Sequence, residues 1–132
     1  MPAVTFENRR DGCYLGESAA LNIINEEIIV ASGAGVLLPG TIIAKITASG
    51  KYVVHDPALS NGAQLPANAI ILFNRVDATS ADVKAVGTVN GPATINGNML
   101  TYLTGMSAPN MLAVRNALRL KGLKVLPQHA GE

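Results

Sequence analysis

The sequence has few aromatic, charged or sulfur-bearing side chains. It has no Trp, and aromatic residues make up 4% of its 132 residues, so binding pockets with aromatic walls are not expected. The single cysteine, Cys13, excludes a disulfide within the chain, and the fold is expected to hold without one. Charged residues are 14% of the sequence, against roughly 25% in an average soluble domain.

The scarcity of charge bears on partners and location. A net charge of +1 at pH 7 offers no general attraction to nucleic acid or to an anionic membrane. The longest apolar runs, such as residues 69–73, are too short to span a bilayer. Residues 1–12 lack the apolar core of a signal peptide, so synthesis in the cytoplasm is expected. Hydrophobic residues reach 48% of the sequence. A soluble chain with so little charge often has a partly apolar surface, and such a surface is usually covered by a partner or by further copies of the chain.

The order of apolar runs and turns predicts one mainly β domain. Turn pairs such as Pro39-Gly40 and Asn61-Gly62 recur at a spacing typical of a sandwich or barrel. Residues 41–47 are apolar on one face and nearly so on the other, which predicts a strand buried on both sides. Turns are predicted at residues 32–35 and 77–82. The predicted strands are residues 14–20, 25–31, 41–47, 51–55, 69–76, 83–89, 93–103 (broken near Asn96-Gly97) and 125–126.

One helix is predicted between Ser107 and Gly122. Ser107 is a good N-cap, and Pro109 lies in the first turn, where its missing N–H costs little. Gly122 is the expected left-handed stop. The apolar stripe of this helix comprises Met111, Val114 and Leu118. Residues 1–11 are polar and without periodicity, so they are expected to form an arm that is mobile until something holds it.

The fold class is therefore mainly β (α+β). The chain is expected to form a small β-barrel or sandwich-like domain, residues 12–132, with one C-terminal helix and a flexible N-terminal arm, residues 1–11.

The side chains that could carry chemistry do not form a catalytic or metal site. Adjacent residues of a strand point to opposite faces, so His55 and Asp56 cannot act as a base and its orienting carboxylate. Cys13 has no nearby His or Lys in the sequence to activate it as a nucleophile. Asp77 and Asp82 are candidate calcium ligands, but Asp77 capping its own turn is the simpler explanation. No catalytic residue, metal ligand or cofactor is predicted.

The basic residues cluster in and just after the predicted helix: Arg115, Arg119, Lys121 and Lys124. Arg115 and Arg119 are four residues apart and share a helix face. The favoured interpretation is a solvated face that complements the helix dipole. The alternative is a secondary contact of Arg115 and Arg119 with an acidic protein surface. Direct nucleic-acid binding is not expected, since no aromatic residues interleave with these cations.

Residues 39–64, PGTIIAKITASGKYVVHDPALSNGAQ, resemble a motif of the phage head decoration proteins of the lambda gpD-like family. Further segments that resemble the family, in the same order, are VASGAGVL at 30–37, RVDATSADVKAV at 75–86 and TIN at 94–96. The closing segment MSAPNMLAVRNALRLKGLKVL, at 106–126, is similar in pattern. The sequence departs from the family around residues 90–93, Asn-Gly-Pro-Ala, where relatives often carry a charged run.

The resemblance implies a structural protein without enzymatic activity. Relatives form homotrimers that bind the major capsid protein on the outer surface of the expanded icosahedral head, at threefold positions, and stabilise it against the pressure of packaged DNA. The resemblance also implies that the arm adds a strand to a capsid-protein sheet. The expected contact residues are Ala3, Val4, Thr5, Phe6, Arg9 and Arg10. Neither a membrane nor nucleic acid is an expected partner.

Two other classes of function are kept as alternatives. One is a small β-barrel module that binds a ligand or carbohydrate, which the low aromatic content disfavours. The other is a hydrolase that uses Cys13 as its nucleophile.

Overall fold

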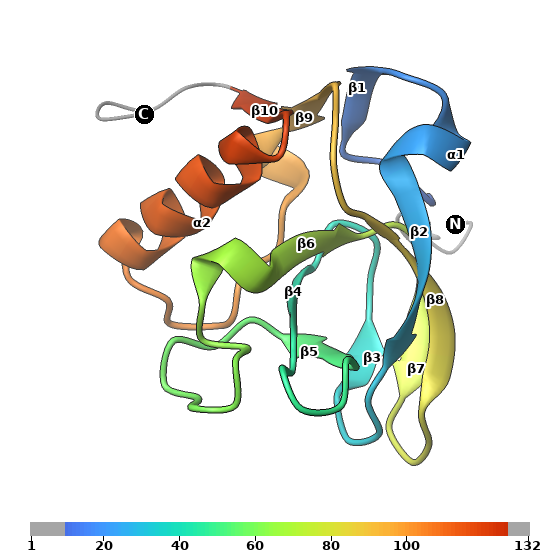
Figure 1. The fold of residues 1–132 in the computed structure, drawn as a ribbon, viewed down its shortest axis with the longest axis vertical. Helices are drawn as coiled ribbons and strands as arrows, with labels where there is room; N and C mark the ends of the chain where they lie inside the picture. Colours follow the sequence, from blue (N-terminus) through green and yellow to red (C-terminus); the bar gives the residue numbers. More distant parts are fainter. Residues whose placement is uncertain (1–9, 127–132) are drawn as a thin grey trace, which may run out of the picture.

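The computed structural model describes residues 10–126 and shows a mainly β domain with one long helix near its C-terminal end (Figure 1). This confirms the predicted fold class. The strands are β1 (Leu15–Ser18), β2 (Asn25–Val30), β3 (Gly35–Leu37), β4 (Ile42–Lys45), β5 (Tyr52–Val54), β6 (Ala69–Leu72), β7 (Val76–Ala78), β8 (Val83–Thr88), β9 (Ala93–Asn96) and β10 (Leu123–Leu126). The helices are α1 (Leu21–Ile24) and α2 (Ala108–Leu120), with 3-10 turns η1 (Pro66–Asn68) and η2 (Gly97–Met99).

Five strands are joined in a ring in the order β2-β5-β4-β6-β8. All neighbours in the ring are antiparallel except β2 and β5. Those two strands are parallel and pair only at Val30 and Tyr52. The ring is thus closed by a single residue pair at this point, which makes it intermediate between a barrel and a sandwich.

Two smaller sheets flank the ring. One has the order β1-β9-β10, with β9 antiparallel to β1 and parallel to β10. Parallel strands need a long crossover, and α2 provides it between β9 and β10. The other sheet pairs β3 with β7, between Gly35–Leu37 and Val76–Ala78.

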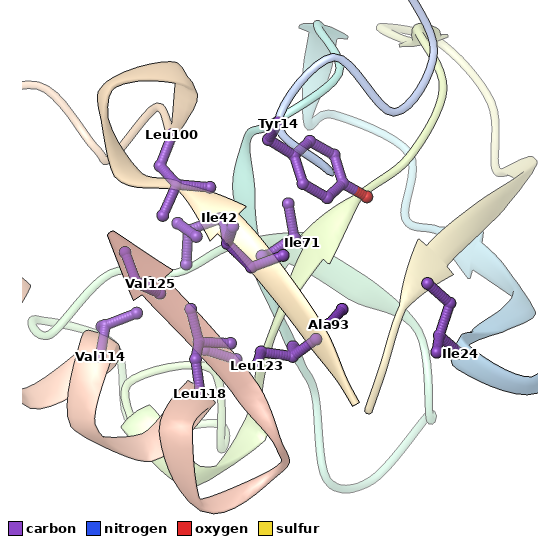
Figure 2. Close-up of a cluster of buried hydrophobic side chains, with 12 residues drawn as sticks. Tyr14, Ile24, Ile42, Ile71, Ala93, Leu100, Val114, Leu118, Leu123 and Val125 are labelled. Atoms are coloured by element: carbon purple, nitrogen blue, oxygen red, sulfur yellow. The ribbon is translucent and has the colours of Figure 1, made fainter. Parts of the chain in front are cut away.

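Strands β4 and β6 separate two clusters of buried side chains. Ile42 and Ile71 belong to the cluster that includes α2 and the β1-β9-β10 sheet, where Figure 2 shows them with Leu118 of α2. Ile43 and Ile70 belong to the second cluster, which is built by the other ring strands and the β3-β7 sheet. Because successive residues of a strand point to opposite faces, one strand supplies both clusters, and this is why residues 42–44 are all buried.

The caps predicted for α2 are present. The Ser107 hydroxyl accepts a hydrogen bond from the Asn110 backbone N–H at 3.4 Å, and Pro109 lies in the first turn. Gly122 has a φ of 86°, the left-handed conformation that ends helices without a Cβ penalty. Val114 and Leu118 are fully buried, so this face packs α2 onto the sheets.

Four of the predicted elements differ from the structure. The expectation of one strand over residues 69–76 is wrong, because β6 ends at Leu72 and β7 begins at Val76. The turns predicted at 32–35 and 77–82 are shorter than expected, since Gly35 and Asp77 lie in paired strands. The long-range β3–β7 pairing overrides the local turn signals there. The strand predicted over 93–103 ends at Asn96, because η2 begins at Gly97 where the break was predicted, but the expectation that the strand resumes is wrong, since residues 97–103 form no further strand.

Candidate docking surface

The predicted arm lies almost entirely outside the described residues. Ala3, Val4, Thr5, Phe6 and Arg9 all precede residue 10, where the description begins. Arg10 is described and is exposed. The structure therefore bears on the place where the arm joins the domain, residues 10–14, which we call the root.

The root is tied to the ring at its first residues. The Gly12 backbone N–H donates to the carbonyl of Phe73, just after β6, at 2.9 Å, and within the root the Cys13 N–H donates to the Arg10 carbonyl at 3.0 Å and forms a turn. The Cys13 thiol lies 3.8 Å from the Pro39 carbonyl, which it faces as a weak donor. Gly12 has a φ of +65°, and a Cβ there would lie 2.7 Å from the Phe73 ring. Glycine is therefore required for the root to lie this close to Phe73.

Tyr14 fastens the root to the interior. Its side chain is fully buried, and its hydroxyl contacts the Thr88 hydroxyl, which donates to the Asn25 side-chain oxygen at 2.7 Å. Because Thr88 has only one hydroxyl hydrogen, Tyr14 is the donor to Thr88. Burial raises the pKa of Tyr14. The Asn96 N–H also donates to the Tyr14 carbonyl at 2.7 Å, so a pull on the root would be transmitted to β8 and β9.

His55 and Asp56 have separate hydrogen-bond partners. His55 is buried, with its Nδ1 2.8 Å from the Ala63 carbonyl, and burial lowers the pKa of the imidazole. The Asp56 carboxylate accepts from the Ala58 N–H at 2.9 Å. Asp56 thus begins a turn as predicted, and His55 is a packed core residue.

The carboxylates of Asp77 and Asp82 also bind different groups. Asp77 accepts from the backbone N–H and the hydroxyl of Thr79, which confirms the predicted cap and lowers the pKa of Asp77. Asp82 pairs with Lys51 at 2.5 Å and accepts from the Ser32 N–H at 2.8 Å. The Lys51 hydrogen bond is the main reason that the pKa of Asp82 is lowered. Within residues 10–126, no group of three or more acidic, His or Cys side chains could hold a metal ion.

The expectation of a solvated basic face on α2 is wrong for Arg115. This side chain is only 6% exposed, and its guanidinium reaches Gly97, where an added Cβ would lie 3.0 Å from Nη1. Arg119 is half-buried. The Lys121 ammonium donates to the Ala69 carbonyl, and burial lowers its pKa. Long cationic side chains can cover apolar surface with their stems, and here they pack α2 onto the domain, with Arg115 presenting little surface to a partner.

The surface of the described chain has shallow hollows lined by few aromatic side chains. One of about 490 Å³ lies between β1, β9 and β10 and includes Glu17 and Lys124. Another, of about 330 Å³, is lined by acidic and basic residues around Tyr52. A third, of about 440 Å³, lies beside β3 and includes Tyr102 but none of Asp, Glu, Lys, Arg or His. No helix within residues 10–126 has the length and apolar character needed to cross a membrane.

The described residues thus form a mainly β domain with a tied N-terminal root, no metal site and shallow surface hollows. Residues 4–123 match the family model described as bacteriophage lambda head decoration protein D. Because the match covers most of the sequence, the chain belongs to this family of structural phage-head proteins, which lie on the exterior of the capsid. No curated protein matches the sequence.

Proposed function

We propose that this protein binds, as homotrimers, to the outer surface of the expanded icosahedral head at threefold positions, and stabilises the head against the pressure of packaged DNA. The observation that carries the proposal is the family match over residues 4–123. Its partner is the major capsid protein. The chain acts without a cofactor and without enzymatic chemistry.

The proposed contact is backbone pairing between the arm and an exposed strand edge of the capsid protein. Residues 3–6, Ala-Val-Thr-Phe, are uncharged and have strand propensity. An extended segment added to a sheet edge gains affinity from its main-chain hydrogen bonds. Arg9 and Arg10 follow, and we place their guanidinium groups against the capsid surface beside that strand.

The root supports this role because it gives the arm a fixed attachment. Gly12 is held at the end of β6 through Phe73, and Tyr14 is held in the interior through Thr88. A force on the arm therefore acts on the packed domain rather than on a loose loop.

Trimer formation would multiply the effect of a weak arm contact. Linking binding segments makes the second and third contacts intramolecular, which can raise avidity by roughly 10²–10⁴ when all sites can be reached together. An unexpanded head whose sites are spaced differently would not satisfy three arms at once. Binding should therefore be selective for the expanded head.

The test is co-sedimentation of the purified protein with expanded and unexpanded heads. We expect the full chain to bind expanded heads, and the chain lacking residues 1–11 to remain folded by circular dichroism but not to bind. The substitution Thr5→Pro removes a backbone donor from the pairing segment and should weaken binding roughly tenfold or more, the equivalent of about 1.4 kcal/mol.

Thr5→Val is the matched control, since it keeps both the backbone donor and the strand propensity, and it should bind like the natural chain. Full occupancy of heads by the chain lacking residues 1–11 would contradict the role of the arm. Absence of binding by the full chain to expanded heads would contradict the proposed function itself.

A further inference from the structure

The ring has the fewest residue pairs where it closes. Strands β2 and β5 pair only at Val30 and Tyr52, and the Ala31 N–H donates to the Tyr52 carbonyl at 2.8 Å. Each strand is held more firmly on its other side, since β2 pairs with β8 and β5 pairs with β4 along their whole lengths. Parting β2 from β5 would therefore leave both strands in the sheet. We call the Val30–Tyr52 pair, with its hydrogen bond from Ala31, the seam.

Hollows lie on both sides of the seam. One, of about 330 Å³, is lined by Ile28 and Ile29 of β2 and by the residues that lead into β5. The other, of about 340 Å³, is lined by residues 32–34, which follow β2, and by Val53 and Val54 of β5. Within the described chain, no second residue of β2 pairs with β5, so no adjacent residue pair supports the seam.

One carboxylate spans the seam. Asp82 lies directly before β8, in which Val83 pairs with Val30. Its Oδ1 accepts from the Ser32 N–H at 2.8 Å, and its Oδ2 accepts from the Lys51 ammonium at 2.5 Å. Ser32 is the second residue after β2, and Lys51 directly precedes β5. Figure 1 shows the β2–β3, β4–β5 and β7–β8 connections together at the lower end of the domain. Each oxygen of Asp82 thus holds a different one of the two strands that meet at the seam.

The contacts of Asp82 are exposed to solvent. The side chains of Lys51 and Asp82 are 39% and 40% exposed, and exposed ion pairs contribute little to the stability of a whole domain. The hydrogen bonds from Lys51 and Ser32 lower the pKa of Asp82, so the carboxylate is charged at neutral pH and makes both contacts in that form. Local opening breaks few bonds and costs less free energy than global unfolding, so a contribution of this size has a large effect on it.

We propose that the ring opens and closes at the seam while the rest of the domain stays folded, and that Asp82 is the latch that keeps it closed. Opening separates the end of β2 from the start of β5, joins the two flanking hollows and admits water to the Ala31 N–H. Neither buried cluster has to unfold, because β2 stays paired with β8 and β5 stays paired with β4. This inference does not depend on the proposed function.

The test is amide hydrogen exchange of the full chain, followed residue by residue by NMR. The Ala31 N–H reports on the seam. The Leu72 N–H, which donates to the Thr41 carbonyl at 2.9 Å at a fully buried position, reports on global unfolding. Exchange at Ala31 should not change with low concentrations of urea, because local opening exposes little surface. Exchange at Leu72 should accelerate over the same range.

Variants of the latch test the role of Asp82. Asp82→Ala removes both contacts and should accelerate exchange at Ala31 roughly 5–30-fold, the equivalent of about 1–2 kcal/mol. Lys51→Met removes only the ion pair and should accelerate it about twofold to fivefold. Circular dichroism establishes that each variant is folded, and Lys51→Met tests the latch by itself if Asp82→Ala does not fold.

Asp77→Ala is the matched control. Asp77 lies in the strand that precedes the same turn, but its carboxylate accepts only from Thr79 within that turn. Its loss can accelerate exchange at Leu72 through global stability, but it should leave exchange at Ala31 unchanged. The inference is overturned if Ala31 follows Leu72 in urea, if neither Asp82→Ala nor Lys51→Met accelerates exchange at Ala31, or if Asp77→Ala accelerates it as much as Asp82→Ala.

Discussion

The structure of the root predicts that replacing Gly12 destabilises the domain. Replacing it with Ala forces an L residue into a φ of +65° and places a Cβ 2.7 Å from the Phe73 ring. Gly33 has a similar conformation, with a φ of +92°, but no atom lies within 4 Å of the position that a Cβ would take there. Gly33→Ala therefore isolates the backbone strain, and Gly12→Ala adds a steric clash to it.

The magnitudes follow from these two terms. Left-handed backbone costs an L residue about 1–2 kcal/mol, which is the loss of unfolding free energy expected for Gly33→Ala. Overpacking against Phe73 adds about 1–3 kcal/mol, so Gly12→Ala should lose about 2–5 kcal/mol in total. The half-buried Phe73 ring is packed against the first cluster, which limits how far it can turn away.

Urea unfolding followed by circular dichroism measures the difference. For an m-value of about 2 kcal/mol per molar, an additional 2 kcal/mol lowers the midpoint by about 1 M. Equal midpoints for the two variants would refute the argument, because they would show that Phe73 does not hold the root. A Gly12→Ala chain as stable as the natural one would refute the backbone term as well.

Two more stability predictions concern the first cluster and its buried hydroxyls. Leu118→Ala should lower the unfolding free energy by about 2–5 kcal/mol because it leaves a cavity in a fully buried site. Leu120→Ala, at an exposed position of the same helix, should change the unfolding free energy by less than about 0.5 kcal/mol. The midpoints of urea unfolding compare the two variants. Tyr14 has a raised pKa when folded, so the unfolded chain releases this proton first as the pH rises through about 10. Stability should be fully present below that pH and decline above it, and Tyr14→Phe should decline less steeply in unfolding measurements between pH 8 and pH 11. A steeper or equal decline for Tyr14→Phe would show that Tyr14 is not the group responsible.

The sequence was sufficient where a local signal met no competing long-range pairing. Ser107, Pro109 and Gly122 bound α2 through caps that act within one helical turn. The two apolar faces of residues 41–47 predicted the burial of β4 on both sides. Such patterns depend on neighbouring residues alone.

The sequence was not sufficient where the cause lies far away in the chain. The β3–β7 sheet forms because residues 35–37 meet residues 76–78, and neither segment contains a strand pattern long enough to predict. Arg115 is buried because Gly97 leaves space for its guanidinium, which α2 alone does not reveal. The helix α1 has no side-chain cap and is too short for a periodicity to be detected. The arm residues Ala3, Val4, Thr5, Phe6 and Arg9 lie outside the described residues, and their role stays a prediction.

The alternation along β4 and β6 has a consequence for how the molecule loses its structure. Ile42 and Ile43 are neighbours that lie in different clusters, as do Ile70 and Ile71. Disordering one cluster would leave one face of β4 and β6 without packing, and the other cluster packs on the opposite face of the same strands. Neither cluster can therefore unfold by itself. The domain should therefore unfold on heating or under tension in a single cooperative transition.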